Sequence, residues 1–186
     1  GRNGGFGAGN NFGIRAGLPD GIRPDFVYVL NSDAFPLPDA IRTLLDHLQK
    51  NPKVGFAGSS IHGSDGVPHR TAFRFPSIAS EFEGQIRFGP VSRWLERFIV
   101  ARPIPDMTTQ VDWLAGASLM MRTSVLDLIG LFDEQFFLYF EETDWCQGAK
   151  KRGIQIKVNP RSQLFHKKRS ENPSGLPKDY YFYYFI

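Results

Sequence analysis

A short apolar run that ends abruptly in polar residues constrains the fold of this chain most. The run covers residues 25–30 (DFVYVL), and Asn31-Ser32-Asp33 follows it directly. Such a continuous run is typical of a strand that is buried on both faces. The next segment has helical spacing, with apolar residues at Ile41, Leu44, Leu45 and Leu48. Residues 54–57 then form a second candidate strand, and the order strand–helix–strand predicts a βαβ unit.

Later segments continue this α/β pattern. Residues 141–152 predict a helix with acidic residues in its first turn and basic residues in its last, and residues 154–158 predict a strand. Residues 163–166 predict a short strand, separated from the preceding one by a turn at Pro160. The range 77–108 lacks a clear pattern, and we interpret it as an insertion or flexible loop. The 186 residues therefore predict one α/β domain, 1–186.

Composition excludes several classes of protein. The net charge of +3 comes from well-mixed charges, which gives no reason to expect nucleic acid as a partner. The single cysteine, Cys146, excludes a scaffold built on internal disulfides and favours a reducing compartment. Because no apolar run approaches the ~20 residues that span a bilayer, we expect a cytoplasmic protein. The aromatic segment 180–186 follows basic residues and is a candidate for contact with the inner face of the membrane.

Asp33 is a candidate metal ligand. It follows a buried strand, and open α/β sheets bind ligands at the carboxyl ends of their strands. Asn31 lies two residues earlier, so the two side chains face the same way in an extended chain. Together they suit a hard cation that also holds a substrate diphosphate. The alternative is that the triplet only turns the chain before Pro36, because Asn, Ser and Asp are favoured turn residues.

Glu141, Glu142 and Asp144 form a second candidate site. Three carboxylates within four residues repel one another, which raises the pKa of at least one of them and makes it a candidate general base. The alternative is purely structural, because acidic residues at the start of a helix complement the helix dipole. The aromatic segment 136–140 beside them indicates either the wall of a pocket or part of the core.

His166 and the N-terminal glycines are weaker candidates. A lone histidine is more often hydrogen-bonded or solvated than a metal ligand, but as a ligand His166 would favour Mn²⁺ over Mg²⁺. Gly5, Gly7 and Gly9 do not form the dinucleotide-binding fingerprint, and no strand leads into them. They indicate either a loop whose backbone approaches a ligand closely or a flexible end.

The order of these motifs is more specific than any one of them. The chain contains, in sequence, GGFGAGNNFGIRAGL, YVLNSDAFPLPDAI and VDWLAGASLMMRTSVLDLIGLFDEQFFLYFEETDWCQGAKKRG, ahead of the strand that ends in His166. This order resembles the family-2 glycosyltransferases, in particular their bacterial rhamnosyltransferase-like branch. The resemblance implies a GT-A fold, a mostly parallel sheet flanked by helices. It also implies metal-dependent, inverting transfer of a sugar from a nucleotide-sugar donor to a saccharide or lipid-linked acceptor in cell-surface polysaccharide synthesis.

The resemblance also implies roles for single residues. Glu142 would be the catalytic base, and Asp33 and His166 would hold Mn²⁺ or Mg²⁺. Gly116 and Ala117, being small, would leave room for the sugar. The residues expected on the donor side are Asn11, Asn31, Gly116, Ala117, Glu141 and Asp144.

One departure from the family pattern concerns the N-terminus. In the family, a strand–helix–strand portion that holds the nucleotide precedes the glycine–asparagine segment, and here it is missing. We therefore expect an N-terminally truncated domain with weak nucleotide binding, whose open sheet edges favour a homodimer. The alternative function is a non-catalytic fragment that serves as an interaction or assembly module. A metal-dependent phosphoesterase using the same acidic residues ranks last.

Overall fold

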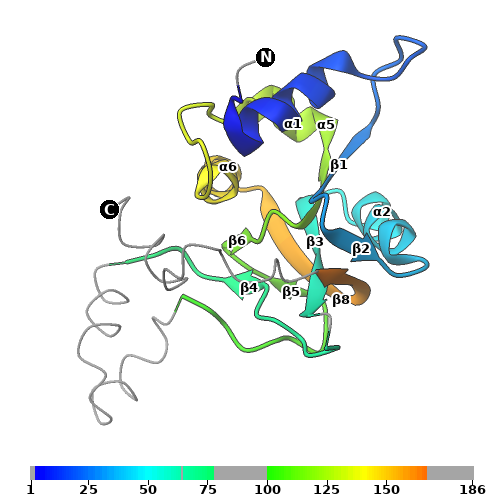
Figure 1. Ribbon diagram of the computed structural model, residues 1–186, viewed down its shortest axis with the longest axis vertical. Helices are drawn as coiled ribbons and strands as arrows, with labels where there is room; N and C mark the ends of the chain where they lie inside the picture. Colours follow the sequence, from blue (N-terminus) through cyan, green and yellow to red (C-terminus); the bar gives the residue numbers. More distant parts are fainter. Residues whose placement is uncertain (1–2, 64, 78–99, 167–186) are drawn as a thin grey trace.

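A mixed β-sheet lies at the centre of the molecule (Figure 1). The computed structural model describes residues 3–63, 65–77 and 100–166. Along the sheet the strands are, in order, β1 (Phe26–Leu30), β7 (Ser118–Arg122), β3 (Val54–Gly63), β8 (Gln155–His166) and β2 (Ala34–Pro36). A short strand, β5 (Thr109–Gln110), also pairs with β8, and β4 (Ala72–Phe73) pairs with β6 (Trp113–Leu114) in a separate small sheet.

Helices cover both faces of the central sheet. They are α1 (Gly5–Ala16), α2 (Ala40–Lys50), α5 (Thr123–Ile129) and α6 (Glu141–Lys151). Figure 1 shows α2 on one side of the sheet and α6 on the other, with α1 and α5 close to the end of α6. The predicted helices over 41–50 and 141–152 are confirmed, whereas the glycine-rich segment expected as a loop forms most of α1.

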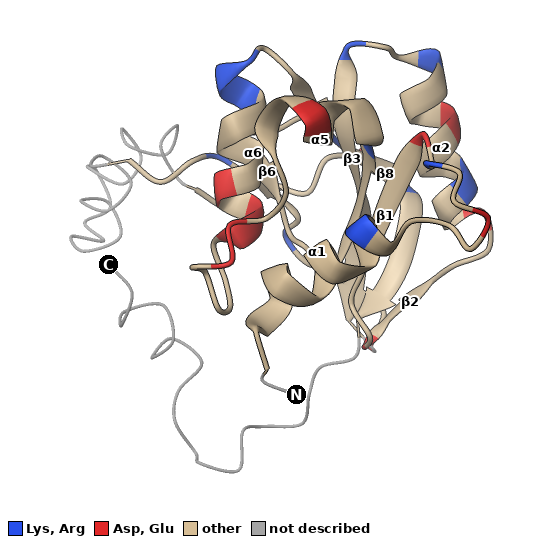
Figure 2. Cartoon of the chain, turned by 90° about the horizontal axis from the view of Figure 1, so that it is seen from above, with Lys and Arg blue, Asp and Glu red and all other residues tan. Residues whose placement is uncertain are grey.

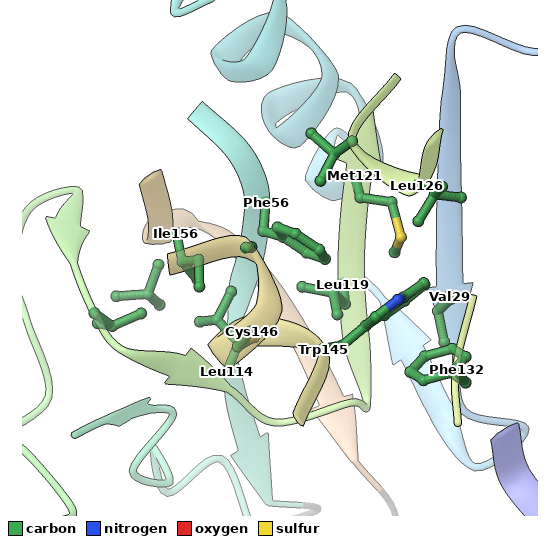
Figure 3. Close-up of a cluster of buried hydrophobic side chains, with 14 of the residues drawn as sticks. Val29, Phe56, Leu114, Leu119, Met121, Leu126, Phe132, Trp145, Cys146 and Ile156 are labelled. Carbon is green, nitrogen blue, oxygen red and sulfur yellow. The ribbon is translucent and has the colours of Figure 1, made fainter. Parts of the chain in front are cut away.

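The core explains the apolar residues of strands β1, β3 and β7. Alternate residues of a strand point to opposite faces, so Phe56 and Met121 pack against α6 while Ala57 and Met120 pack against α2. On the α6 side, Trp145 and Cys146 extend toward Phe56 and the neighbouring strands (Figure 3). Strand β1 contacts both clusters, Val27 and Val29 on one face and Phe26 and Tyr28 on the other, but only Val29 is fully buried, so the expected two-sided burial of this run is partial.

The predicted fold class is confirmed, but the prediction of a mostly parallel sheet is wrong. β1 and β3 run in the same direction, as the βαβ prediction requires, but β7 lies between them and is antiparallel to both. Among the described strands of this sheet only β3 and β8 pair in parallel. An apolar run indicates burial on both faces and carries no information about strand direction, which is why the sequence pattern did not reveal this.

The carboxyl end of the sheet contains two features that the sequence pattern missed. The first is a bulge: β8 continues through Pro160, and its register shifts so that Asn159 pairs with Ser59 while Gln163 pairs with Ser60. In the bulge, Ser162 donates a hydrogen bond to the Ala40 carbonyl oxygen at 2.9 Å. The second is β2, an edge strand that tolerates Pro36 because edge strands do not need every N–H. Its pairing with β8 places Ala34 opposite His166.

Two sequence-based predictions concern residues that lie largely outside the described part of the chain. Residues 78–99, most of the predicted insertion at 77–108, lie outside the described residues, as does the aromatic segment 180–186. Within the described ranges, no helix has both the length and the hydropathy that a membrane crossing requires.

Candidate active site

Asp33 and His166 are brought together although 132 residues separate them in the sequence. The chain turns after β1, where the Ala34 N–H donates to the Asn31 carbonyl oxygen at 3.1 Å, and then enters β2. The triplet Asn31-Ser32-Asp33 therefore does turn the chain, as the alternative interpretation expected, and its metal-binding role stays a prediction. Because β2 pairs with the end of β8, Asp33 lies beside His166, with 3.1 Å between Asp33 Oδ1 and His166 Nε2. Both side chains remain about one-third exposed, 35% and 29% respectively.

The Asp33–His166 pair has a donor set that fits a divalent cation. The contact has the distance of an ion pair but not the geometry of a hydrogen bond, and the buried Nε2 of His166 has no hydrogen-bond partner. An imidazole nitrogen and a carboxylate oxygen that converge in this way are suitable ligands for an ion such as Mn²⁺. Within the described residues no group of three or more His, Cys, Asp or Glu could hold a metal, so substrate oxygens or water would complete the coordination.

Glu142 lies in the first turn of α6 and has the properties of a general base. Burial, followed by repulsion from Glu141, raises the pKa of Glu142 to about 7, although hydrogen bonds from backbone groups of Gly116 and of Glu142 itself oppose the shift. Its Oε2 is buried and has no hydrogen-bond partner. The residue as a whole is half-buried, and a carboxyl group whose pKa is close to neutrality suits general-base chemistry.

The segment Gly116–Ala117 connects the two groups. A Cβ added at Gly116 would lie 3.7 Å from Glu142 Cδ. On the other side, the Asn31 N–H donates to the Ala117 carbonyl oxygen at 3.2 Å, and Asn31 begins the turn that carries Asp33. One short segment therefore borders Glu142 on one side and the start of the turn that carries Asp33 on the other.

The other two acidic residues of α6 differ from Glu142. Glu141 is 3% exposed, and burial raises its pKa. Asp144 is exposed, because two residues along a helix rotate a side chain by ~200°. Figure 2 shows the acidic first turn of α6 beside α1. The structure therefore keeps Glu141 with Glu142 and directs Asp144 to solvent.

Asn11 lies in a contact that holds α1 in place. It is completely buried, and its Nδ2 donates to the Phe132 carbonyl oxygen at 2.8 Å and to Glu134 Oε1 at 2.9 Å. Its Oδ1 accepts from the Phe132 N–H at 3.0 Å. Both amide hydrogens are thus used within the chain, and the side chain joins α1 to the segment 132–134. The expected contact of Asn11 with a donor stays a prediction, and this geometry leaves no free amide hydrogen for it.

Replacement of Asn11 by alanine should destabilise the fold. The change leaves the buried N–H and carbonyl oxygen of Phe132 without partners, which we expect to lower the free energy of unfolding by about 2–3 kcal/mol. Asn10→Ala is the matched control, because Asn10 donates only to the Phe6 carbonyl oxygen of its own helix, and its effect should be below about 0.5 kcal/mol. Urea unfolding followed by circular dichroism measures both values. Equal effects of the two changes would contradict the role given to Asn11.

Two features near the site were missed by the sequence analysis. Phe6 of α1 lies beside Gly116, where a Cβ would be 3.6 Å from Phe6 Cζ. Tyr139 and Phe140, directly before α6, have φ values of 70° and 71°, a conformation that costs a non-glycine residue free energy and is concentrated at functional sites. In the sequence, the only sign that could have pointed to Phe6 is its position between two glycines, Gly5 and Gly7. Nothing in the sequence indicated the backbone conformation of Tyr139 and Phe140.

Comparison with known proteins places this chain in a family. The model of glycosyl transferase family 2 matches residues 1–112. The N-acetylglucosaminyl-diphospho-decaprenol L-rhamnosyltransferase of Mycobacterium tuberculosis is 30% identical over 146 residues, which are 77% of this chain and 47% of that protein. The rhamnosyltransferase WbbL of Escherichia coli K12 is 23% identical over 178 residues, 94% of this chain and 65% of that protein. The chain thus spans about half to two-thirds of the length of these relatives.

A solved structure agrees with the fold. GalNAc-T7, crystallised with UDP, GalNAc and Mn²⁺, superposes with a TM-score of 0.61 over 91% of this chain and 32% of that chain, at 13% identity. This similarity confirms the predicted GT-A fold. The matching family model, which covers more than half of the sequence, shows that the chain belongs to glycosyl transferase family 2.

Proposed function

We propose that the chain carries the catalytic site of a metal-dependent, inverting glycosyltransferase. The donor would be a nucleotide sugar, and the acceptor a saccharide or a lipid-linked saccharide of a surface glycan. The observation that carries the proposal is that Glu142, with its raised pKa, and the turn of Asp33 border the same segment, Gly116–Ala117. The names of the two rhamnosyltransferase relatives support the reaction class, and the diphospho-decaprenol in one name supports a lipid-linked acceptor.

In this proposal Glu142 removes the proton of the attacking hydroxyl group. As the acceptor oxygen forms its bond to the anomeric carbon, the bond from that carbon to the diphosphate oxygen breaks on the opposite face. The proton moves to the Oε2 of Glu142, which has no other partner. Because its pKa is about 7, a large fraction of Glu142 is ionised at neutral pH and ready to accept the proton.

Asp33 and His166 would hold the departing side of the donor through Mn²⁺ or Mg²⁺. A bound divalent cation supplies positive charge that neutralises the charge developing on the nucleoside diphosphate. The imidazole nitrogen of His166 favours Mn²⁺ of the two. Asn31, at the start of the same turn, and the small residues Gly116 and Ala117 would border the sugar between the two halves of the site.

The proposal is tested by the stereochemistry of transfer. The chain is incubated with Mn²⁺, a panel of nucleotide sugars, and saccharide and polyprenyl-diphosphate acceptors. We expect a glycosidic product whose anomeric configuration, determined by NMR coupling constants, is opposite to that of the donor, and we expect EDTA to abolish its formation. A product of retained configuration, or an undiminished rate in EDTA, would contradict the proposal.

An assembly role is the second candidate, and one observation favours it. Among the described strands β1 pairs only with β7, so its other edge presents unpaired backbone groups. Such an edge can pair with another strand, including β1 of a second copy. Sedimentation analysis over a range of concentrations tests for this homodimer. Transfer by this chain that is lost in Glu142→Gln would refute a purely non-catalytic role.

A further inference from the structure

The first turn of α1 brings an aromatic ring to the proposed base. A Cβ added at Gly116 would lie 3.6 Å from Phe6 Cζ and 3.7 Å from Glu142 Cδ. The ring and the carboxyl group therefore border the same small space beside Gly116, although Phe6 and Glu142 are far apart in the sequence. The ring is itself fixed by an edge-to-face contact with Phe132, with 5.9 Å between the ring centroids.

We propose that Phe6 is a positioning residue for Glu142. The Phe6 ring covers the Glu142 carboxyl group on the side of α1 and limits the contact of that group with water. This inference rests on the function proposed above, because it matters for catalysis only if Glu142 is the base. It also gives a purpose to the N-terminal glycines, for which the sequence analysis left two interpretations open.

The glycines on either side of Phe6 allow α1 to approach the segment before α6 closely. Gly5 has a φ of +88°, and a Cβ there would lie 2.1 Å from the Phe137 carbonyl oxygen, which no side chain permits. A Cβ at Gly7 would lie 3.2 Å from the Cβ of Phe132. The Phe6 N–H donates to the same Phe137 carbonyl oxygen at 3.1 Å. The pattern G-F-G thus lets the backbone dock against residues 132–137 and places the ring between the glycines beside Gly116, the residue that Glu142 also borders.

The ring acts on Glu142 through burial, since it carries no charge. The charged or titratable groups that face this carboxyl group are Glu141 on the same helix and Cys146 one turn later, whose pKa burial raises to about 12, so that the thiol stays neutral. α1 contributes no charged side chain before Arg15, which pairs with Glu134, and Gly116 contributes a backbone hydrogen bond. Removing the ring should therefore admit water and lower the pKa of Glu142 toward its ordinary value.

A carboxyl titration of the whole chain tests this inference without any donor or acceptor. The ¹³C side-chain carboxyl signals of glutamate are followed against pH by NMR, and the Glu142 signal is assigned by its absence in Glu142→Gln. We expect a midpoint near 7 in the wild type and a midpoint lower by about 1 pH unit in Phe6→Ala. Phe12→Ala is the matched control, because Phe12 lies on the same helix but is 77% exposed, and its midpoint should equal that of the wild type.

A second variant keeps the test decisive if Phe6→Ala does not fold. Gly116→Ala adds a methyl group at ordinary contact distance from both the ring and the carboxyl group, so it fits the structure and should raise the midpoint by excluding more water. A midpoint that is unchanged in folded Phe6→Ala, or lowered in Gly116→Ala, would overturn the inference. If the proposed function alone is wrong, both shifts persist while Glu142→Gln leaves transfer intact, so the two failures are distinguishable.

Discussion

Replacement of Glu142 by glutamine should lower kcat for sugar transfer by about 10²–10⁴-fold, the usual contribution of a general base. Glutamine retains the size and polarity of the side chain but cannot accept the proton of the acceptor hydroxyl group. The effect should appear in kcat rather than in KM for the donor, because the lost interaction is made only as the hydroxyl attacks. Initial rates at saturating donor, measured for both proteins at pH 8, give the comparison.

The pH dependence of transfer gives an independent view of the same group. The pKa of Glu142 is raised to about 7, so below that pH its carboxyl group is mostly protonated and cannot act as a base. The rate should therefore fall as the pH decreases through about 7. Asp106→Asn is the control, since Asp106 is an exposed carboxylate in the described part of the chain, and both its rate and its pH profile should match the wild type. A Glu142→Gln enzyme with undiminished kcat would exclude Glu142 as the base.

Loss of either predicted metal ligand should weaken Mn²⁺ binding by at least about 100-fold. Mutation of a residue that only orients a metal ligand lowers metal affinity by up to about 100-fold. Asp33→Ala and His166→Ala each remove a ligand itself, so we expect an effect at least as large. Isothermal titration of Mn²⁺ into the protein with UDP, GDP or dTDP present measures the affinity. Both side chains are about one-third exposed, so we expect the two variants to fold with little loss of stability.

Two control variants distinguish the loss of a metal ligand from the loss of a negative charge elsewhere in the chain. Asp20→Ala removes one exposed carboxylate from the loop before β1 and should leave the Mn²⁺ affinity unchanged. Glu142→Gln should also retain Mn²⁺ binding, because the base and the ligand pair have separate tasks in the proposal. Wild-type affinity in both Asp33→Ala and His166→Ala would remove this pair as the metal site.

Much of the fold could be predicted because burial leaves a direct trace in the sequence. The apolar run of β1 and the acid-first, base-last pattern of α6 indicated these elements correctly. The direction of β7 and the addition of β2 could not be predicted, because they depend on pairing between distant segments. The same limit applied to the bulge in β8, where Ser162 bonds to the start of α2.

The candidate site was predictable to the extent that its residues carry charge. Asp33, Glu142 and His166 stood out by residue type and position, and the resemblance to a family supplied their grouping. Phe6 is neutral and lies in a segment whose glycines suggested a loop, so its place beside Gly116 became evident only from the packing of α1. The donor-side role of Asn11 came from the family resemblance and stays a prediction, whereas its structural contacts with residues 132–134 depend on packing that the sequence does not reveal.

The most direct test of the shared site is anomalous diffraction from crystals grown with Mn²⁺ and a nucleoside diphosphate. The account predicts one Mn²⁺ peak coordinated by Asp33 and His166, with the diphosphate on the side of the ion that faces Gly116–Ala117 and Glu142. A Mn²⁺ ion held by other residues, or a diphosphate separated from Glu142 by the sheet, would contradict it.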